Sequence, residues 1–205
     1  AIVINHAIAM IASGNGVFFC PHPRGYKSSL YAMQVMNRAI VEAGGPADTM
    51  VALAKGSMEA VTAACAHPAV GMIVATGGPA VVDAALRSGK KAIGAGPGNP
   101  PVLVDETADL VKAAKDILDG ASFDNNILCI AEKTIIAVES IAEELKRQFL
   151  ALPEIYWLSP AEASRVEKVI FPEGKLNGEL VGKDAAYILG QAGIRVDEKI
   201  RLAIM

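Results

Sequence analysis

The sequence predicts an α/β fold with a parallel, Rossmann-like sheet flanked by helices, and features of its first hundred residues support this. Short apolar runs alternate with longer segments in which apolar residues recur at helical spacing. The run at 70–75 is almost purely apolar, as expected for a strand covered on both faces. Signals that begin or end helices lie between these segments, such as Ser57 before one and Gly44 and Gly45 after another. Strands that alternate with helices in this way form parallel sheets with right-handed crossovers.

The same reasoning gives the order of elements in the first part of the chain. Helices are expected where apolar residues repeat every three or four positions, at 1–12, 26–43, 57–66 and 80–88. Strands are expected at the short apolar runs between them, at 17–20, 49–54, 70–75, 91–94 and 102–104. The glycine- and proline-rich stretch at 94–101 is the best candidate for a hinge, and it predicts two domains, residues 1–97 and residues 98–205.

The second part of the chain is expected to be the first half of another α/β domain. Thr107 is expected to cap a helix that ends at Gly120, with Asp109 in its first turn. Ser159 and Glu162 form a capping box, with a proline at the first helical position, which opens a helix to about residue 170. The other expected elements are strands at 134–138 and 201–205 and helices at 141–150 and 184–192.

The composition excludes several classes of protein. With 52% hydrophobic and 20% charged residues, the 205-residue chain can bury a sizeable core. The net charge of −3 is spread along the chain, without a basic stripe for nucleic acid or a polybasic helix for a membrane surface. Three cysteines fit neither a disulfide framework nor a zinc site, which favours a reduced, cytosolic protein without a bound metal. The chain starts without Met inside an expected helix and ends in an expected strand, which indicates a fragment.

Cys129 lies in a polar connection, residues 122–133, between an expected helix and an expected strand. Two asparagines come before it, and a glutamate and Lys133 follow. A structural cysteine is more often found within an apolar run. A thiol becomes a nucleophile when it ionises, and nearby positive charge favours ionisation. Two interpretations stay open on local sequence, a reactive thiol and an inert, half-buried cysteine.

The best candidate for a ligand loop is Thr76, Gly77, Gly78 and Pro79, between an expected strand and an expected helix. Glycines allow a ligand to approach the backbone, and a helix N-terminus offers free N–H groups to a phosphate. The alternative is a tight turn that needs glycine only for its dihedral angles.

Two further stretches border the candidate site or connect elements. Gly94, Ala95 and Gly96 begin a glycine-rich segment that lacks the spacing of a dinucleotide fingerprint, and a strand follows it rather than a helix. His22 is held between Pro21 and Pro23 and is expected to be exposed. The histidines do not have metal-ligand spacing.

Taken in order, five motifs resemble those of the aldehyde dehydrogenase superfamily. Within it they are most similar to the CoA-acylating aldehyde dehydrogenases of bacterial microcompartments, which act on propionaldehyde and acetaldehyde. The resemblance covers essentially the whole chain. The motifs lie at 14–23, 75–79, 89–101, 104–109 and 120–133.

The resemblance implies an NAD-dependent oxidation with Cys129 as the catalytic nucleophile. Cys129 would add to the aldehyde, and loss of a hydride to NAD⁺ would leave an acyl thioester. The Cys129 N–H would form part of the oxyanion hole, which an asparagine upstream of residue 1 completes in the family. Residues 76–79 match the loop at the cofactor pyrophosphate. Residues 20–23 fall at the adenosine ribose, where hydrolytic relatives carry Lys-Pro-Ser-Glu and this chain has Cys20 for the lysine and His22 for the serine.

The resemblance also implies that coenzyme A accepts the acyl group. Hydrolytic relatives activate water with the glutamate of a Glu-Leu-Gly-Gly segment, and alignment on the glycines puts Ala95 at that position, with Gly94 and Gly96 beside it at the cofactor. No acidic residue occurs between Asp83 and Asp105. Without this base, a thiol is the better acceptor. A homo-oligomer acting on a small aldehyde, in the cytoplasm or the lumen of a microcompartment, is further implied.

Two alternatives stay open beside this interpretation. An acyl-phosphate reductase of the same superfamily would need a basic group for phosphate near Cys129, and Lys133 is the visible candidate. A catalytically incomplete nucleotide-binding module is the other, because part of the family's catalytic domain is missing from this chain.

Overall fold

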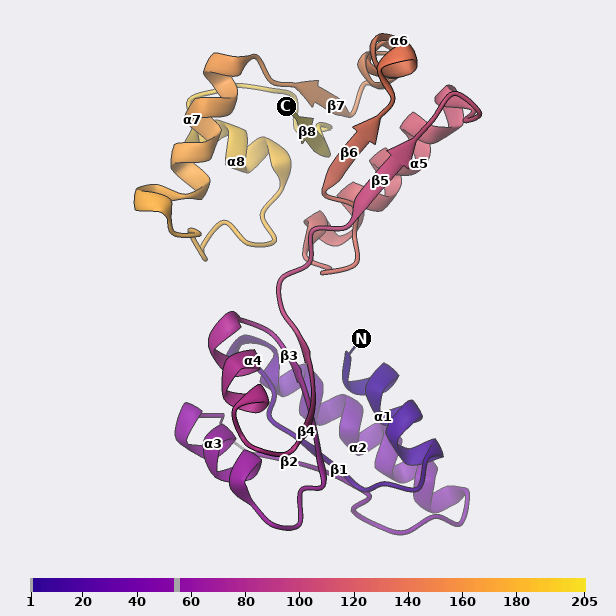
Figure 1. Cartoon of the computed structure of the whole chain (residues 1–205), viewed down its shortest axis with the longest axis vertical. Coiled ribbons are helices and arrows are strands. Elements are labelled where there is room, and N and C mark those ends of the chain that lie inside the picture. Colours follow the sequence, from indigo (N-terminus) through magenta and orange to yellow (C-terminus); the bar gives the residue numbers. More distant parts are fainter. Residues whose placement is uncertain (1, 54–55) are drawn as a thin grey trace. The chain divides into compact units, whose positions relative to one another are not determined.

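The computed structural model describes residues 2–53 and 56–205 and confirms the α/β class. These residues form eight α-helices, eight short strands and three 3₁₀ turns (Figure 1). Helices and strands alternate, except that two strands follow each other at 91–104 and two helices at 160–191. The chain divides into two compact units between Gly96 and Pro97. We call the part up to Gly96 the first unit and the part from Pro97 the second unit.

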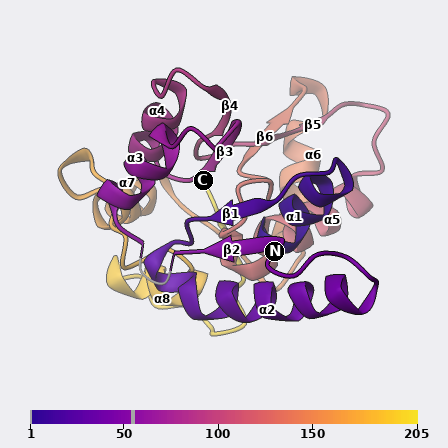
Figure 2. The same ribbon diagram turned by 90° about the horizontal axis from the view of Figure 1, so that it is seen from below.

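The first unit contains two βαβ crossovers preceded by a helix. Its strands pair in parallel, β1 with β2 and β3 with β4 (Figure 2 shows β1 and β2 side by side, with α2 alongside). The N-terminal core contains one buried residue from each of the first two helices and the first two strands, namely Ala7, Val17, Met33 and Met50. The elements are α1 (Ile2–Ala12), β1 (Val17–Phe19), α2 (Tyr26–Glu42), β2 (Met50–Ala52), α3 (Met58–Ala66), β3 (Met72–Thr76), α4 (Pro79–Leu86) and β4 (Lys91–Ala95).

The second unit repeats the parallel pairing, β5 with β6 and β7 with β8. One core packs α5 and α6 against the β5–β6 pair around Leu118 and Phe149, and a second lies between α7 and α8 around Leu189. The elements are β5 (Pro101–Val104), α5 (Leu110–Ser122), β6 (Thr134–Ala137), α6 (Glu139–Leu150), β7 (Ile155–Trp157), α7 (Pro160–Ile170), α8 (Ala185–Gln191) and β8 (Leu202–Ile204), with 3₁₀ turns at Phe123–Asn126 and Pro172–Gly174. The remaining 3₁₀ turn of the described residues, Pro23–Gly25, belongs to the first unit.

Parallel pairing is confirmed, but the strands lie in four separate pairs in the described ranges rather than in one continuous sheet. Each strand has three to five residues. The strand expected at 49–54 is observed at Met50–Ala52, and its last expected residue lies outside the described residues. None of the described helices combines the length and apolar character that a membrane span requires.

The start of α5 corrects one prediction. Asp109, not Thr107, caps the helix, because its carboxylate accepts the Lys112 N–H at 3.1 Å. Thr107 is engaged elsewhere, since its hydroxyl and N–H both donate to the Asp105 carboxylate, and these two bonds lower the pKa of that carboxyl. The capping box at Ser159 and Glu162 is confirmed by reciprocal bonds.

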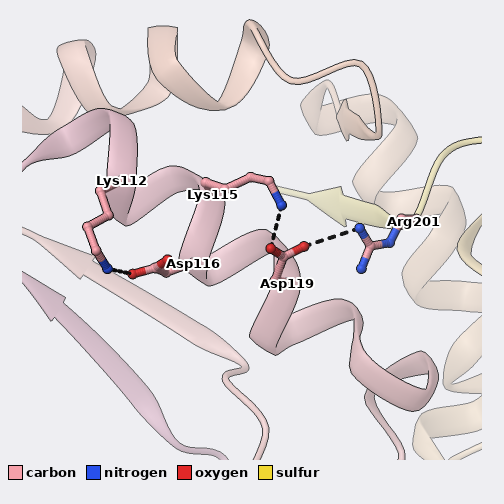
Figure 3. A network of polar contacts seen from close by, with 5 residues as sticks. All are labelled: Lys112, Lys115, Asp116, Asp119 and Arg201. Atoms are coloured by element: carbon pink, nitrogen blue, oxygen red, sulfur yellow. Dashed lines mark hydrogen bonds and ion pairs between the residues drawn. The ribbon is translucent and has the colours of Figure 1, made fainter.

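A polar network ties α5 to the segment that leads into β8 (Figure 3). The carboxylate of Asp119 accepts from Lys115, one turn earlier on α5, and from Arg201 Nη1 at 3.2 Å. The hydrogen bond from Lys115, followed by that from Arg201, lowers the pKa of Asp119. Lys112 and Asp116 form a second pair on the same helix. The helix that ends just before the Cys129 loop is therefore fixed to the last strand of the second unit.

Candidate active site

Cys129 occupies the second position of a tight turn in the second unit. The turn runs from Leu128 to Ala131 and is closed by a hydrogen bond from the Ala131 N–H to the Leu128 carbonyl, at 3.2 Å. The Cys129 side chain is exposed, whereas Cys65 is buried in the first unit. A half-buried structural cysteine therefore does not describe Cys129. Its thiol is open to a reactant, as a nucleophile must be.

The neighbouring Lys133 stabilises this turn through its ammonium group. Its Nζ donates to the carbonyl of Leu128 at 2.9 Å and to that of Ala131 at 3.2 Å. Its backbone N–H donates to the Pro100 carbonyl at 3.0 Å, just before β5. Lys133 thus bonds to both ends of the turn that contains Cys129, and it also links this turn to the residue before β5.

Gly98 is a site residue that sequence reasoning missed. A Cβ at position 98 would lie 2.1 Å from the Cys129 carbonyl oxygen, so only glycine allows the two backbones to approach this closely. Gly98 belongs to the glycine-rich segment judged above to be a connection. The signal that could have found it is that segment itself, since glycines mark positions where another backbone comes near.

The backbone N–H of Cys129 is available to a ligand. Among the hydrogen bonds of the described residues, none uses this N–H. A free N–H beside a nucleophilic sulfur can donate to the oxygen that becomes negatively charged when the sulfur adds to a carbonyl.

In the first unit, the two glycine-rich stretches meet at the carboxyl ends of β3 and β4. The Gly77 N–H donates to the Ala95 carbonyl at 3.2 Å, and Thr76 pairs with Ala95 in the ladder. A Cβ at Gly77, Gly78 or Gly96 would meet nothing within 4 Å. Residues 76–79 therefore expose their backbone at the N-terminus of α4, at the end of parallel strands where α/β proteins bind ligands.

Gly94 is exposed, but its Cα faces the side chains of α4. A Cβ there would lie 2.7 Å from Val82 Cγ1 of α4, so glycine at this position lets α4 pack on β4. This packing explains why position 94 is a glycine. A contact of Gly94 with a cofactor stays a prediction. Ala95 and Gly96 are exposed at the end of the strand.

Pro21, His22 and Pro23 follow β1, at the end of the other strand pair of the first unit. His22 is exposed, as predicted, and its Nδ1 accepts the Arg24 N–H at 3.2 Å, which caps the short 3₁₀ turn. Within the described ranges, no cluster of three histidine, cysteine or acidic side chains could hold a metal ion.

Comparisons with known proteins decide the family. Residues 1–155 match the family model described as "Aldehyde dehydrogenase family". The chain belongs to the aldehyde dehydrogenase family. It is 46% identical over 197 residues to the propanal dehydrogenase (CoA-propanoylating) of Salmonella typhimurium, covering 96% of this chain and 42% of that protein.

Solved aldehyde dehydrogenases show the same fold. A propionaldehyde dehydrogenase from the fucose utilisation microcompartment of Clostridium phytofermentans superposes with a TM-score of 0.89 at 45% identity, over 98% of this chain and 46% of the other. The propionaldehyde dehydrogenase of Rhodopseudomonas palustris with bound CoA and an acylated cysteine gives a TM-score of 0.87 at 45% identity, over 98% and 46% of the chains. This aldehyde dehydrogenase chain thus spans less than half the length of the relatives it matches.

Proposed function

We propose that the complete protein in which this chain occurs oxidises a short-chain aldehyde to an acyl-CoA, with NAD⁺ as oxidant and Cys129 as the nucleophile. The observation that carries the proposal is the exposed Cys129 side chain on a hydrogen-bonded turn, together with a Cys129 N–H that no hydrogen bond among the described residues uses. Membership of the aldehyde dehydrogenase family, with acylating enzymes among the relatives, supports it.

The chemistry proceeds through a covalent bond to Cys129. Its thiolate attacks the aldehyde carbon, and the Cys129 N–H donates to the oxygen that becomes an oxyanion. Collapse of the oxyanion expels a hydride, which NAD⁺ as the oxidant would accept, and leaves the acyl group on Cys129 Sγ as a thioester. The acyl group is then transferred to the thiol of CoA, whose proton is lost, and the Cys129 thiolate is released.

Residues of the first unit fit a dinucleotide. Residues 76–79 would hold its pyrophosphate, because their backbone is open and lies at the N-terminus of α4. Gly94, Ala95 and Gly96 would border it, and Pro21, His22 and Pro23 would lie at the adenosine ribose. When bound, the nicotinamide supplies the hydride acceptor.

The position of Lys133 argues against an acyl-phosphate reductase. That activity needs a cation free to bind phosphate beside Cys129. The ammonium of Lys133 instead donates to two carbonyls of the turn. The acceptor we propose is therefore a thiol, in line with the relatives described as CoA-propanoylating and acetylating.

The names of the relatives support a substrate class and a setting. We propose a small aldehyde of the propanal or acetaldehyde class as substrate, and a cytoplasmic location that includes the lumen of a microcompartment. We also propose a homo-oligomer as the working form, as the family resemblance implies. A product assay with propanal, NAD⁺ and CoA tests the function. Propanoyl-CoA and NADH in equal amounts are expected, and NADH formation without any acyl-CoA would overturn it.

Replacing Gly78 by valine should weaken NAD⁺ binding by about tenfold or more, which corresponds to ~1.4 kcal/mol. Gly78 has an extended backbone (φ −67°, ψ 158°), and a Cβ there meets nothing within 4 Å, so valine fits the fold. A loss of affinity would therefore report a blocked approach to the backbone. Titration of the complete protein with NAD⁺ measures it.

Gly71→Val is the matched control. Position 71 lies just before β3, and a Cβ there also meets nothing within 4 Å. NAD⁺ affinity should stay unchanged in this variant. Equal affinity in Gly78→Val and the unmutated protein would exclude residues 76–79 as the pyrophosphate loop.

A further inference from the structure

The loop that carries Cys129 has an unusual backbone. Asp124, Asn125 and Asn126 adopt left-handed conformations one after another, with φ of 50°, 51° and 58°. Side chains of most residue types are unfavourable there, and aspartate and asparagine tolerate it best. Three such residues in a row need other contacts to hold them, and these contacts come from the two asparagine side chains.

Asn126 joins the two ends of the loop. Its Nδ2 donates to the carbonyl of Ala121, on the last turn of α5, at 2.5 Å. The same nitrogen donates to the carbonyl of Glu132, just before β6, at 3.0 Å. The residues between these two carbonyls include Cys129, so a single half-buried amide closes the loop that presents the thiol.

Other contacts fix the loop to its surroundings. Asn125 Nδ2 donates to the Gly182 carbonyl at 3.1 Å and to Asp184 Oδ1 at 2.8 Å, ahead of α8. Lys133 Nζ bridges the two ends of the inner turn. Asn126 therefore closes the whole loop between Ala121 and Glu132, and Lys133 closes the shorter turn from Leu128 to Ala131 within it.

We propose that Asn126 and Lys133 are positioning residues, which hold the Cys129 thiol and its N–H in the orientation that reaction with the aldehyde needs. The inference rests on the proposed role of Cys129. Neither side chain is bonded to the sulfur among the described contacts, so both act through the backbone of the loop. Small displacements of a nucleophile reduce the rate of reaction more than substrate binding.

The test uses the complete protein and the variants Asn126→Gly and Lys133→Met. Glycine accepts the left-handed backbone at position 126, so this variant removes the two amide bonds without adding strain. Both variants should lower kcat by about tenfold or more while KM for NAD⁺ stays nearly constant. The alkylation rate of Cys129 by limiting iodoacetamide, mapped by peptide mass, should change as well.

Matched variants separate positioning from general loop stability. Asp124→Gly places glycine at another left-handed position of the same turn and should keep kcat and the alkylation rate. Lys133→Arg keeps a donor for the two carbonyls and should restore most of the activity lost in Lys133→Met. Lys112→Met, which removes an exposed charge on α5, should have no effect.

Two outcomes would overturn the inference in distinguishable ways. If Cys129 is alkylated normally and kcat is kept in both Asn126→Gly and Lys133→Met, the positioning role is wrong and the proposed function stands. If a Cys129→Ala variant retains activity, the proposed function is wrong and the positioning role falls with it.

Discussion

Replacing Cys129 by alanine should reduce aldehyde oxidation by the complete protein at least about a thousandfold, as expected when a covalent nucleophile is lost. The thiol forms the bond through which the whole reaction proceeds, and no other group on the described turn can take its place. NADH formation with propanal and saturating CoA measures the effect. NAD⁺ affinity should be unchanged, because the residues proposed to bind it lie in the first unit.

The other two cysteines are the controls. Cys65 is buried. Although part of the Cys20 side chain is exposed, desolvation raises the pKa of its thiol, and the nearby Cys65 adds to this effect. Less thiolate at neutral pH makes Cys20 a poor nucleophile. Cys20→Ala should retain most of the activity, and a loss there equal to that of Cys129→Ala would place the chemistry in the first unit instead.

Introducing a carboxylate at position 95 should open a hydrolytic reaction. Ala95 is exposed at the end of β4, at the position where the resemblance puts the glutamate of hydrolytic relatives. A positioned base accelerates proton transfer by roughly a hundred- to ten-thousandfold. Ala95→Glu should therefore raise the release of free acid without CoA by on the order of a hundredfold. The measurement is the ratio of carboxylic acid to acyl-CoA, with and without CoA.

Ala95→Gln is the matched control for this gain. Glutamine has the size of glutamate but cannot act as a base, so free acid should stay at the level of the unmutated protein. If the unmutated protein already forms free acid as fast without CoA as it forms acyl-CoA with it, the acylating function is wrong.

Local signals explain which elements could be predicted from the sequence. The capping box at Ser159 is contained within four residues, and the structure confirms it. The cap of α5 was misplaced because Asp105, before the helix, engages Thr107 and leaves Asp109 as the cap. The strand Ile155–Trp157 was not predicted, although residues 155–158 form a short apolar run of the kind that indicates the other strands.

The site shows the same division between local and tertiary signals. Cys129 could be found because its polar surroundings are contiguous in the chain. The contact of Gly98 with the Cys129 carbonyl joins residues about thirty positions apart, and no periodicity encodes it. The bonds of Asn126 depend on three left-handed residues in succession, a conformation that the sequence of the loop permits but does not specify.

The central claim is that an acyl group passes through Cys129 to CoA. The most direct measurement is the mass of the Cys129 peptide after the complete protein reacts with propanal and NAD⁺ in the absence of CoA, with one equivalent of NADH formed. We expect a propanoyl thioester on Cys129, which disappears on addition of CoA as an equal amount of propanoyl-CoA forms. An unmodified Cys129 after that burst of NADH, or an acyl group on a different residue, would contradict the account.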